Sequence, residues 1–336
     1  MKYPFPKVDL HYHLDGAIVP EVGWKIAQQP DVDLDIHSFE EYTKLTTVPP
    51  LCTDVFEYLA KFGPIVKLMQ TKDHLREITY TSIKRAAQQG LFYLEPRFAP
   101  QKHTEKGLTQ RQAVEAVLEG MRMAERDCPS IKCGLILCCM IDFNDNHAEN
   151  METVRLAEEF MGKGVVAVDL AGGEDTVPME HYADLFVEYH KKGLPMSIHA
   201  GDNGKPENVA TAIDWGATRI GHGKKCWYNK DVMQKVIDTN TTLEVCLTSN
   251  YQCRTEDSYE SHPAKKLFDA GVRVTLNTDN MSISNIDLDF EYDIARNILG
   301  FSYNDLIQMN IYSIEGSFMP EEEKPAYIAR LKEFLR

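Results

Sequence analysis

The sequence lacks any segment that is typical of a membrane or secreted protein. No apolar run among its 336 residues approaches the ~18 residues that a spanning helix requires. The opening residues, MKYPFPKVDLHYHLDG, lack the basic segment, the apolar segment and the small-residue cleavage site of a secretory signal. We therefore expect a cytoplasmic protein without a membrane partner.

Positively charged residues are outnumbered by negatively charged ones. The chain has 36 Lys and Arg against 51 Asp and Glu, a formal net charge of -15, and no long Lys/Arg run that could follow a phosphate backbone. We therefore expect no nucleic-acid partner. The acidity itself indicates no substrate, because many enzymes of small molecules carry such a charge for solubility.

The eight cysteines include no C-x-x-C pair and show no spacing typical of a disulfide framework, so we expect free thiols in a reducing compartment. Three of them, Cys138, Cys139 and Cys246, lie in apolar runs and are predicted to be core residues. The chain also lacks low-complexity linkers and repeats of fixed period. We predict a single domain over residues 1–336.

What is present is an alternation of short apolar runs with longer helical patterns, which is typical of repeated βα units around a buried parallel sheet. Eight is the number of parallel strands that closes a TIM barrel. The sequence therefore predicts an α/β fold, a TIM (β/α)8 barrel. The eight runs are KVDLHYHL from Lys7, LFYLEPRFA from Leu91, CGLILCCM from Cys133, VVAVDLAG from Val165, PMSIHAG from Pro195, TRIGHG from Thr218, TLEVCLTSN from Thr242 and VRVTLNTDN from Val272.

Helical patterns fill the intervals between these runs, and several end on a glycine suited to a helix C-terminus. The interval from Pro20 to Gly90 is too long for one crossover, so we predict extra helices inserted after the first strand. Two of these, at 53–69 and 72–89, are expected to lie over the barrel mouth. The other predicted helices cover 109–126, 150–162, 181–192, 205–215, 230–239 and 263–270.

Histidine and aspartate recur at the carboxyl ends of the runs, the face on which TIM barrels build active sites. His11 and His13 alternate along a strand, so both imidazoles point to one side of it. An H-x-H alone is a weak signal, but a closed barrel brings His199 and Asp279 to the same place. Three histidines and one carboxylate suit one zinc ion per chain, with iron, cobalt or manganese as alternatives.

His222, in RIGHG at the end of the sixth run, has three interpretations. A metal ion lowers the pKa of a bound water to about 7, and His222 is placed to orient or deprotonate that water. It could instead be a fifth ligand, or a structural histidine packed beside the site.

These motifs resemble one known family. KVDLHYHLDGA, IHAGD, RIGHG, EVCLTSN and TLNTDN, together with GLILCCM and DLAGGE, are similar to motifs of the adenosine deaminases in the amidohydrolase superfamily, and the resemblance extends from Lys7 to SIEGSF. It implies hydrolysis of the C6 amine of adenosine or deoxyadenosine to inosine or deoxyinosine and ammonia. The H-x-E and P-C-x-x-C signature of nucleic-acid deaminases is absent.

The resemblance also implies roles for single residues in the binding of a purine nucleoside and a zinc ion. Asp202 would protonate the purine N1 and His222 would help to activate the attacking water. The zinc ligands would be His11, His13, His199 and Asp279, and the nucleoside contacts would be His13, Asp15 at the ribose hydroxyls, Gly172 at N3 and Asn280 at N7.

Two positions depart from the family's usual pattern. Asp202 stands where HAGE is usual, and its side chain is shorter by one methylene, while an acid must come within about 2.6–3.2 Å of the atom it protonates. Asn280 stands where TDD is common, which is a milder change because an amide also donates. Two alternatives therefore remain: a hydrolase of the same barrel that acts on another aminopurine or modified nucleoside, and a binding protein that retains the metal site without turnover.

Three further features have structural interpretations. Glu174 in AGGED could replace the acid but is expected to be solvated. Glu95 and Arg97 are expected to form an inward ion pair within the barrel. The aromatic residues at positions 56, 58 and 62 are expected to pack in the core, with a lid over the purine as the alternative.

Overall fold

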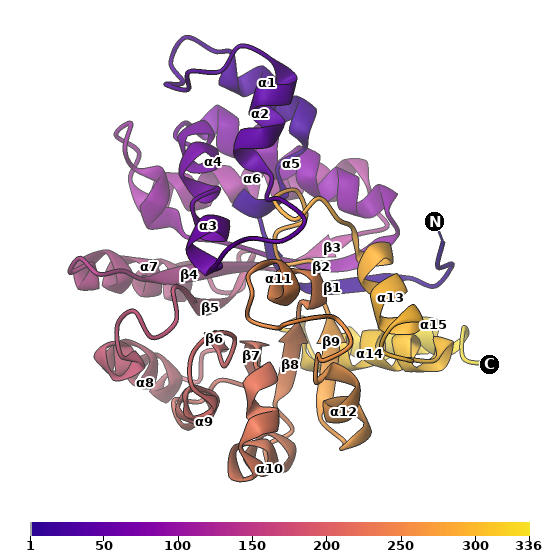
Figure 1. The fold of residues 1–336 in the computed structure, drawn as a ribbon. Coiled ribbons are helices and arrows are strands. Elements are labelled where there is room, and N and C mark those ends of the chain that lie inside the picture. The colour runs from indigo at the N-terminus through magenta and orange to yellow at the C-terminus, as the bar shows by residue number, and fades with distance from the viewer. Residues whose placement is uncertain (1) are drawn as a thin grey trace.

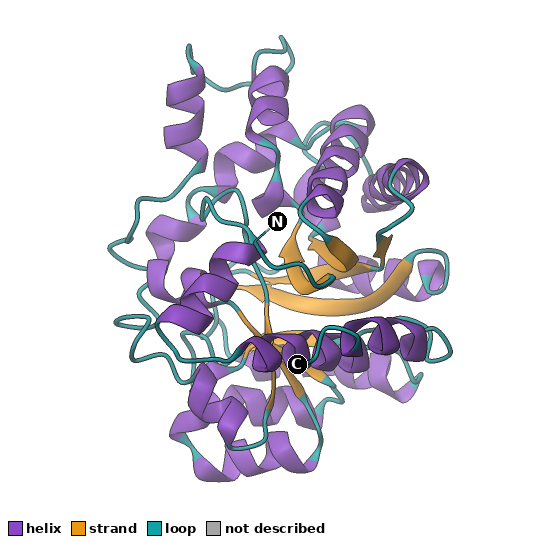
Figure 2. Cartoon of the chain, turned by 90° about the vertical axis from the view of Figure 1, so that its right-hand side faces the viewer, coloured by secondary structure: helices purple, strands orange, loops and turns teal. Residues whose placement is uncertain are grey.

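The computed structural model describes residues 2–336 and contains the expected parallel strands (Figures 1 and 2). Helices surround the strands on the outside. The strands are β1 (Lys7–His13), β2 (Leu91–Phe98), β3 (Lys132–Cys133), β4 (Leu135–Ile141), β5 (Val165–Gly172), β6 (Ser197–Ala200), β7 (Arg219–His222), β8 (Thr242–Val245) and β9 (Arg273–Leu276).

Each helix range that the sequence predicts is occupied by helix, with ends that differ by a few residues, whereas the helices from residue 288 onward were not predicted. The α-helices are α1 (Pro20–Ala27), α2 (Phe39–Thr46), α3 (Val55–Leu59), α4 (Phe62–Leu68), α5 (Lys72–Gln88), α6 (Gln110–Asp127), α7 (His147–Phe160), α8 (Ala183–Lys191), α9 (Pro206–Asp214), α10 (Lys230–Asp238), α11 (Leu247–Gln252), α12 (Ala264–Asp269), α13 (Leu288–Asn297), α14 (Tyr303–Gly316) and α15 (Lys324–Lys332).

Two parallel sheets close into the barrel. One has the order β1-β2-β4-β5, with the two-residue β3 beside β2, and the other has the order β6-β7-β8-β9. Parallel bridges join them at Val168 to Met196 and at Tyr12 to Asp279. The second junction is held by the His13 N–H, which donates to the Asp279 carbonyl at 2.8 Å, and by the Asp279 N–H, which donates to the His11 carbonyl at 2.8 Å. The predicted TIM barrel is confirmed, and its closure sets Asp279 beside both histidines of β1.

The strands are mostly apolar because both faces of the barrel wall are buried, one toward the barrel interior and the other against the surrounding helices. In β4 six of seven residues are buried, and in β2 all eight are. The helices need only one apolar stripe against this wall. In α6 that stripe includes Val114, Val117 and Met121, and the helix begins with a capping box between Thr109 and Gln112.

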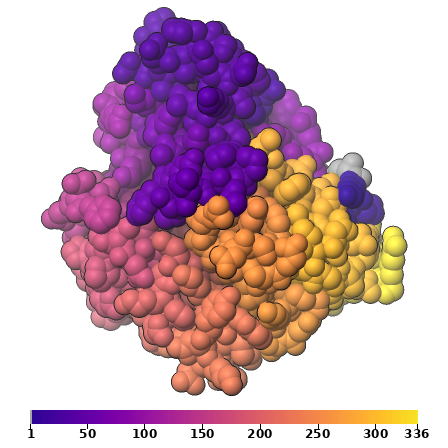
Figure 3. All heavy atoms as spheres, in the orientation of Figure 1, coloured from indigo at the N-terminus to yellow at the C-terminus, as the bar shows by residue number. Residues whose placement is uncertain are grey.

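The segment after β1 differs in detail from the prediction. The expected helix at 53–69 is two helices, α3 and α4, separated at Ala60 and Lys61. The helix α5 packs beside α6 in the outer ring, so its expected position over the barrel mouth is wrong. Figure 3 shows the inserted segment covering one side of the molecule and meeting residues near position 250. There the Cys52 N–H donates to the Gln252 carbonyl at 3.0 Å.

The run TLEVCLTSN is not one strand. The strand β8 ends at Val245, and Leu247–Gln252 form the short helix α11. The carboxylate of Glu291 accepts hydrogen bonds from the N–H groups of Leu247 at 2.8 Å and Thr248 at 3.1 Å. These are among the first N–H groups of α11, which no carbonyl within the helix can pair. Glu291 lies far away in the sequence, so the run alone did not reveal this turn into a helix.

Among residues 2–336, no helix has the length and apolar character that crossing a membrane requires.

Candidate metal centre and active site

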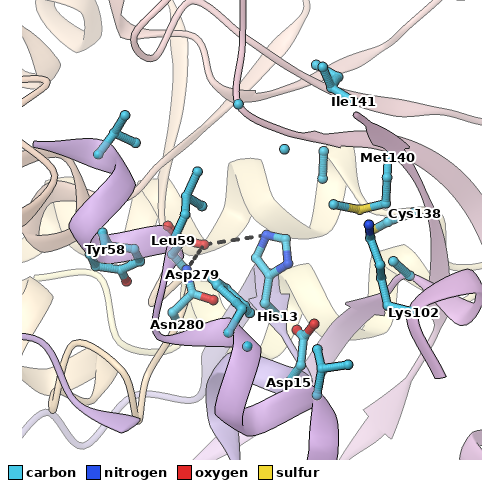
Figure 4. A pocket seen from close by; sticks show the side chains of 18 of the residues that line it. His13, Asp15, Tyr58, Leu59, Lys102, Cys138, Met140, Ile141, Asp279 and Asn280 are labelled. Carbon is cyan, nitrogen blue, oxygen red and sulfur yellow. Dashed lines mark hydrogen bonds and ion pairs between the residues drawn. The ribbon is translucent and has the colours of Figure 1, made fainter. Parts of the chain in front are cut away.

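A cavity of about 1020 Å³ opens at the carboxyl ends of the strands (Figure 4). One side carries His13, Asp279 and Asn280, and the apolar side chains of Cys138, Met140 and Ile141 line another side. The predicted residues Asp15, Gly172, His199, Asp202 and His222 also line it. His11 lies below the cavity floor and is fully buried. Every residue that the sequence singled out for chemistry therefore lies in or directly beneath this one cavity.

The three histidines and Asp279 place their ligand atoms around a common point. The Nε2 atoms of His13 and His199 are 3.3 Å apart, and Asp279 Oδ1 lies 3.5 Å from Nε2 of both His11 and His13. The ligand atoms of His11, His13 and Asp279 all lie within 4.8 Å of one another, and so do those of His11, His199 and His222. The two groups share His11.

These spacings fit a transition-metal ion. Two nitrogens at about 2.0–2.1 Å from a zinc ion in tetrahedral geometry lie roughly 3.4 Å apart. His11 Nε2 is buried and has no hydrogen-bond partner among the described residues, which is costly unless a ligand satisfies it. A third group joins His222, Asp279 and Cys246, and burial holds the pKa of the Cys246 thiol well above its usual value.

Carboxylates on the far side of the rings fix which nitrogen faces the centre. Glu244 Oε2 lies 2.8 Å from His11 Nδ1, and Asp169 Oδ2 lies 2.9 Å from His199 Nδ1. Arg97 links the two carboxylates, at 2.8 Å from Asp169 and 2.7 Å from Glu244. Such outer partners orient metal-binding imidazoles and leave Nε2 toward the metal.

Glu95 and Arg97 were expected to pair with each other, and this expectation is wrong. Both side chains are buried inside the barrel, but Glu95 pairs with Arg219 and Arg97 pairs with Asp169 and Glu244. Alternation along one strand correctly predicted that both side chains point inward, whereas the partners come from strands far away in the sequence.

His222 lies against this centre, with its ring centroid 5.0 Å from that of His11 and 5.4 Å from that of His199. Its Nδ1 atom is 3.0 Å from the side-chain nitrogen of Asn250. Burial lowers the pKa of His222 to about 4, so the ring is neutral at neutral pH.

Asp202 is held at one of its two oxygens. Oδ1 accepts from Asn250 at 2.8 Å and from Thr255 at 2.8 Å, and it lies 3.0 Å from Lys224 Nζ. Burial alone would raise the pKa of Asp202, but the ammonium of Lys224 and these hydrogen bonds outweigh it and hold that pKa well below its usual range. Asp202 is therefore a carboxylate at neutral pH in this structure.

Glu174 is not solvated, so that expectation is wrong. It is buried, and its carboxylate accepts from the N–H groups of Gly201 at 2.6 Å, Asp202 at 2.9 Å and Gly204 at 3.0 Å, and from Asn208. A Cβ at Gly204 would lie 2.4 Å from this carboxylate. Glu174 thus shapes the loop that carries Asp202, and its hydrogen bonds leave it poorly placed to replace Asp202 as an acid.

Three predicted nucleoside contacts lie at the cavity wall. Burial raises the pKa of Asp15 to about 7. Gly172 ends β5 with φ of 121°, and a Cβ there would lie 2.8 Å from the Ile141 carbonyl, so glycine is required. Asn280 donates one amide hydrogen to Asp279 Oδ1 at 2.7 Å, and its own buried Oδ1 has no partner among the described residues.

The aromatic residues of the inserted segment were expected to pack in the core. Tyr58 is buried in the core and Phe62 packs against it, and both also line the cavity. The Tyr58 hydroxyl lies 2.7 Å from the Ser284 hydroxyl. Phe56 is exposed. Core packing is therefore confirmed for Tyr58 and Phe62 and wrong for Phe56, and the first two also lie where a cover over the substrate would.

Several residues of the site were missed from the sequence, namely Lys224, Asn250, Thr255, Asp169, Glu244 and His262. Asp169, Glu244 and Asn250 were visible as polar residues inside apolar runs, and a buried polar group needs a partner. Lys224 lies outside the run TRIGHG, and its position two residues after His222 is the signal that could have found it.

The comparisons with known proteins agree with this geometry. The family model of adenosine deaminase matches residues 6–334. An adenosine deaminase of Haemophilus ducreyi is 38% identical over 331 residues, covering 97% of this chain and 95% of the relative. One of Clostridium perfringens is 35% identical over 320 residues, covering 95% and 96%.

Solved structures share the fold. An adenine deaminase from Arthrobacter aurescens has a TM-score of 0.88 at 23% identity and covers 98% of both chains. An amidohydrolase from Burkholderia ambifaria with bound zinc has a TM-score of 0.88 at 24% identity, covering 98% of this chain and 90% of the other. Fold and site together define a metal-dependent hydrolase on a TIM barrel. The chain belongs to the adenosine deaminase family.

Proposed function

We propose that this protein hydrolyses adenosine and deoxyadenosine to inosine and deoxyinosine with release of ammonia, using one bound metal ion. The observation that carries the proposal is the cluster of three histidines and Asp279 at the floor of a cavity large enough for a nucleoside. Relatives that match this chain over nearly its full length are named adenosine deaminases, which supports this choice of substrate.

His11, His13, His199 and Asp279 are the proposed ligands, and their nitrogen-rich donor set favours zinc. When bound, such an ion lowers the pKa of a water to about 7 and supplies a hydroxide nucleophile at neutral pH. Glu244 and Asp169 hold the imidazoles of His11 and His199 in the required orientation.

The nucleoside would lie across the cavity with its C6 above the histidines. In this placement Asp15 accepts a hydrogen bond from a ribose hydroxyl, the backbone of Gly172 faces N3, and Asn280 faces N7. His13 contacts the base from below. The apolar wall formed by Met140, Ile141 and Tyr58 excludes water from the ring.

Asp202 is the proposed acid. Water adds its oxygen to C6, N1 takes a proton, and the amine leaves with a further proton as ammonia, so adenosine plus water gives inosine plus ammonia. Asp202 is ionised in the free protein, so it must take up a proton as the substrate complex forms. A purine that covers its free oxygen removes water from the carboxylate, which raises its pKa.

A second candidate is deamination of another aminopurine or a modified nucleoside. Asp202 favours it, because the side chain is one methylene shorter than the glutamate of the usual motif and is tied to Lys224 at 3.0 Å. A differently placed ring nitrogen would suit such a withdrawn carboxylate.

The test is a substrate panel with purified, metal-loaded protein. Adenosine, deoxyadenosine, adenine and N6-substituted adenosine are followed by ultraviolet absorbance and by ammonia release, for the wild type and for Asp202→Glu. The proposal expects adenosine or deoxyadenosine to have the highest kcat/KM, and Asp202→Glu to preserve or raise it. Preference for another aminopurine, with Asp202→Glu slower on every compound, would support the second candidate. No turnover on any compound would reject both.

A further inference from the structure

We propose that a directional chain of hydrogen bonds from the backbone of Ala264 through His262 and Asn250 fixes His222 as a hydrogen-bond donor, with its Nε2–H toward the reaction centre. His262 and Asn250 are then positioning residues. This inference rests on the proposed function. The sequence left open whether His222 orients or deprotonates the attacking water, binds the metal as a fifth ligand, or is structural, and the inference assigns it the first role, that of orienting the water.

The chain begins at a group that can only donate. The backbone N–H of Ala264 lies 3.1 Å from His262 Nδ1, so this nitrogen must be the acceptor. His262 is buried, and burial lowers its pKa to about 3, so the ring is neutral and carries its single proton on Nε2. The tautomer of His262 therefore follows from a backbone amide.

The second step fixes the orientation of the Asn250 side chain. His262 Nε2 lies 3.0 Å from Asn250 Oδ1, which suits a donor facing an amide oxygen. The amide nitrogen of Asn250 lies 2.8 Å from Asp202 Oδ1, and an ionised carboxylate can only accept. Two independent neighbours, one donor and one acceptor, therefore require the same orientation of this amide.

The third step reaches His222. The amide nitrogen of Asn250 also lies 3.0 Å from His222 Nδ1 and must donate to it, which leaves the proton of a neutral His222 on Nε2. The ring packs against those of His11 and His199, the residues proposed to bind the metal. Nε2–H therefore faces the place where the attacking oxygen and C6 meet.

A protonated Nε2 cannot accept the proton of the attacking water. It can donate a hydrogen bond to that oxygen, which holds the attacking oxygen in place and stabilises its ionised form. A water whose pKa is already near 7 needs no additional base at neutral pH. The same amide of Asn250 also contacts Asp202, so it sets the relative positions of the groups proposed to act on C6 and on N1.

The first measurement reads the tautomer directly. In metal-loaded protein labelled with 15N-histidine, the signals of His222 are assigned by their loss in His222→Gln. The proposal expects Nε2 protonated and Nδ1 unprotonated in the wild type. A wild-type spectrum with the proton on Nδ1 would overturn it, whether or not adenosine is the substrate.

The second measurement uses a variant that reverses the direction of the hydrogen bond between residue 250 and His222. In Asn250→Asp a carboxylate faces His222 and can only accept, so the proton should move to Nδ1 and kcat should fall by about 10²-fold, with little change in KM. His262→Gln is the conservative comparison, because its amide can accept from Ala264 and donate to Asn250; it should keep the wild-type tautomer. An exchanged tautomer with unchanged kcat would show that the donor role is wrong, and an unexchanged tautomer would show that the chain does not set it.

Discussion

At the scale of single residues, the environment of Asp202 decides how the site can work. The HAGD motif shows that an aspartate occupies the position of the proposed acid, but it does not show that Lys224, Thr255 and Asn250 all converge on one carboxylate oxygen. Lys224 is fully buried and also donates to the Asp202 carbonyl at 2.7 Å. The proposed acid is therefore paired with a fixed cation, an arrangement that only the folded chain reveals.

Replacing Asp202 by Asn should lower kcat on the preferred substrate by about 10²-fold or more, because the side chain keeps its size but loses the ability to deliver a proton. Steady-state kinetics at saturating substrate measure this effect. Near-normal turnover in Asp202→Asn would remove the acid role from this residue. Glu174 is not the alternative we would then test first, because its carboxylate is occupied by backbone N–H groups.

Replacing Lys224 by Met should change the pH dependence of turnover. Loss of the ammonium raises the pKa of Asp202, so the proposed acid stays protonated to higher pH in the substrate complex, and the alkaline limb of kcat should move upward by about one pH unit or more. Lys225→Met is the matched control, since Lys225 Nζ donates to the Asn203 carbonyl and does not contact Asp202. A pH profile that is the same in both variants would contradict the role assigned to Lys224.

At the scale of elements, apolar runs predicted all eight barrel strands, and helical patterns predicted most of the outer helices. These predictions failed where the hydrophobic pattern continued beyond the point at which contacts with distant residues end the strand or helix. EVCLTSN reads as a strand through Asn250, yet α11 begins at Leu247 because Glu291 accepts from its first N–H groups. The predicted helix over 53–69 likewise missed the break at Lys61. Both errors concern segments that form the walls of the cavity.

The pairing of Glu291 with α11 predicts a pH-dependent stability. Burial raises the pKa of Glu291 from its ordinary value of 4.5 to about 7. The folded state therefore binds a proton at Glu291 more tightly than the unfolded state does. The stability gained from this difference is fully present below about pH 4.5, and it is lost as the pH rises through about 7. At 1.36 kcal/mol per pH unit, the free energy of unfolding should fall by roughly 2–3 kcal/mol between about pH 5 and 8 from this group.

Urea unfolding of the wild type and Glu291→Gln at both pH values isolates this contribution. The glutamine keeps an oxygen that accepts from α11 but does not titrate, so the decline in its stability with pH should be smaller by that amount. Equal declines in the two proteins would show that Glu291 is ionised throughout this range in the folded protein.

At the scale of the whole molecule, the site exists because the barrel closes. Residues 11 and 13 on β1 meet Asp279 across the junction of the first and last strands, and β6 brings in His199. Strand-end position and barrel closure made this convergence predictable from the sequence. The buried pairing of Arg97 with Asp169 and Glu244 was not predictable, because it depends on which strands face each other across the barrel.

The central claim is that His11, His13, His199 and Asp279 hold one metal ion on which deamination depends. It is tested most directly by metal analysis and adenosine turnover measured on the same samples of wild type and His199→Ala, with circular dichroism to establish that both are folded. We expect about one metal ion per chain and turnover in the wild type, and the loss of both together in the variant. Full metal occupancy or undiminished turnover in folded His199→Ala would contradict the account.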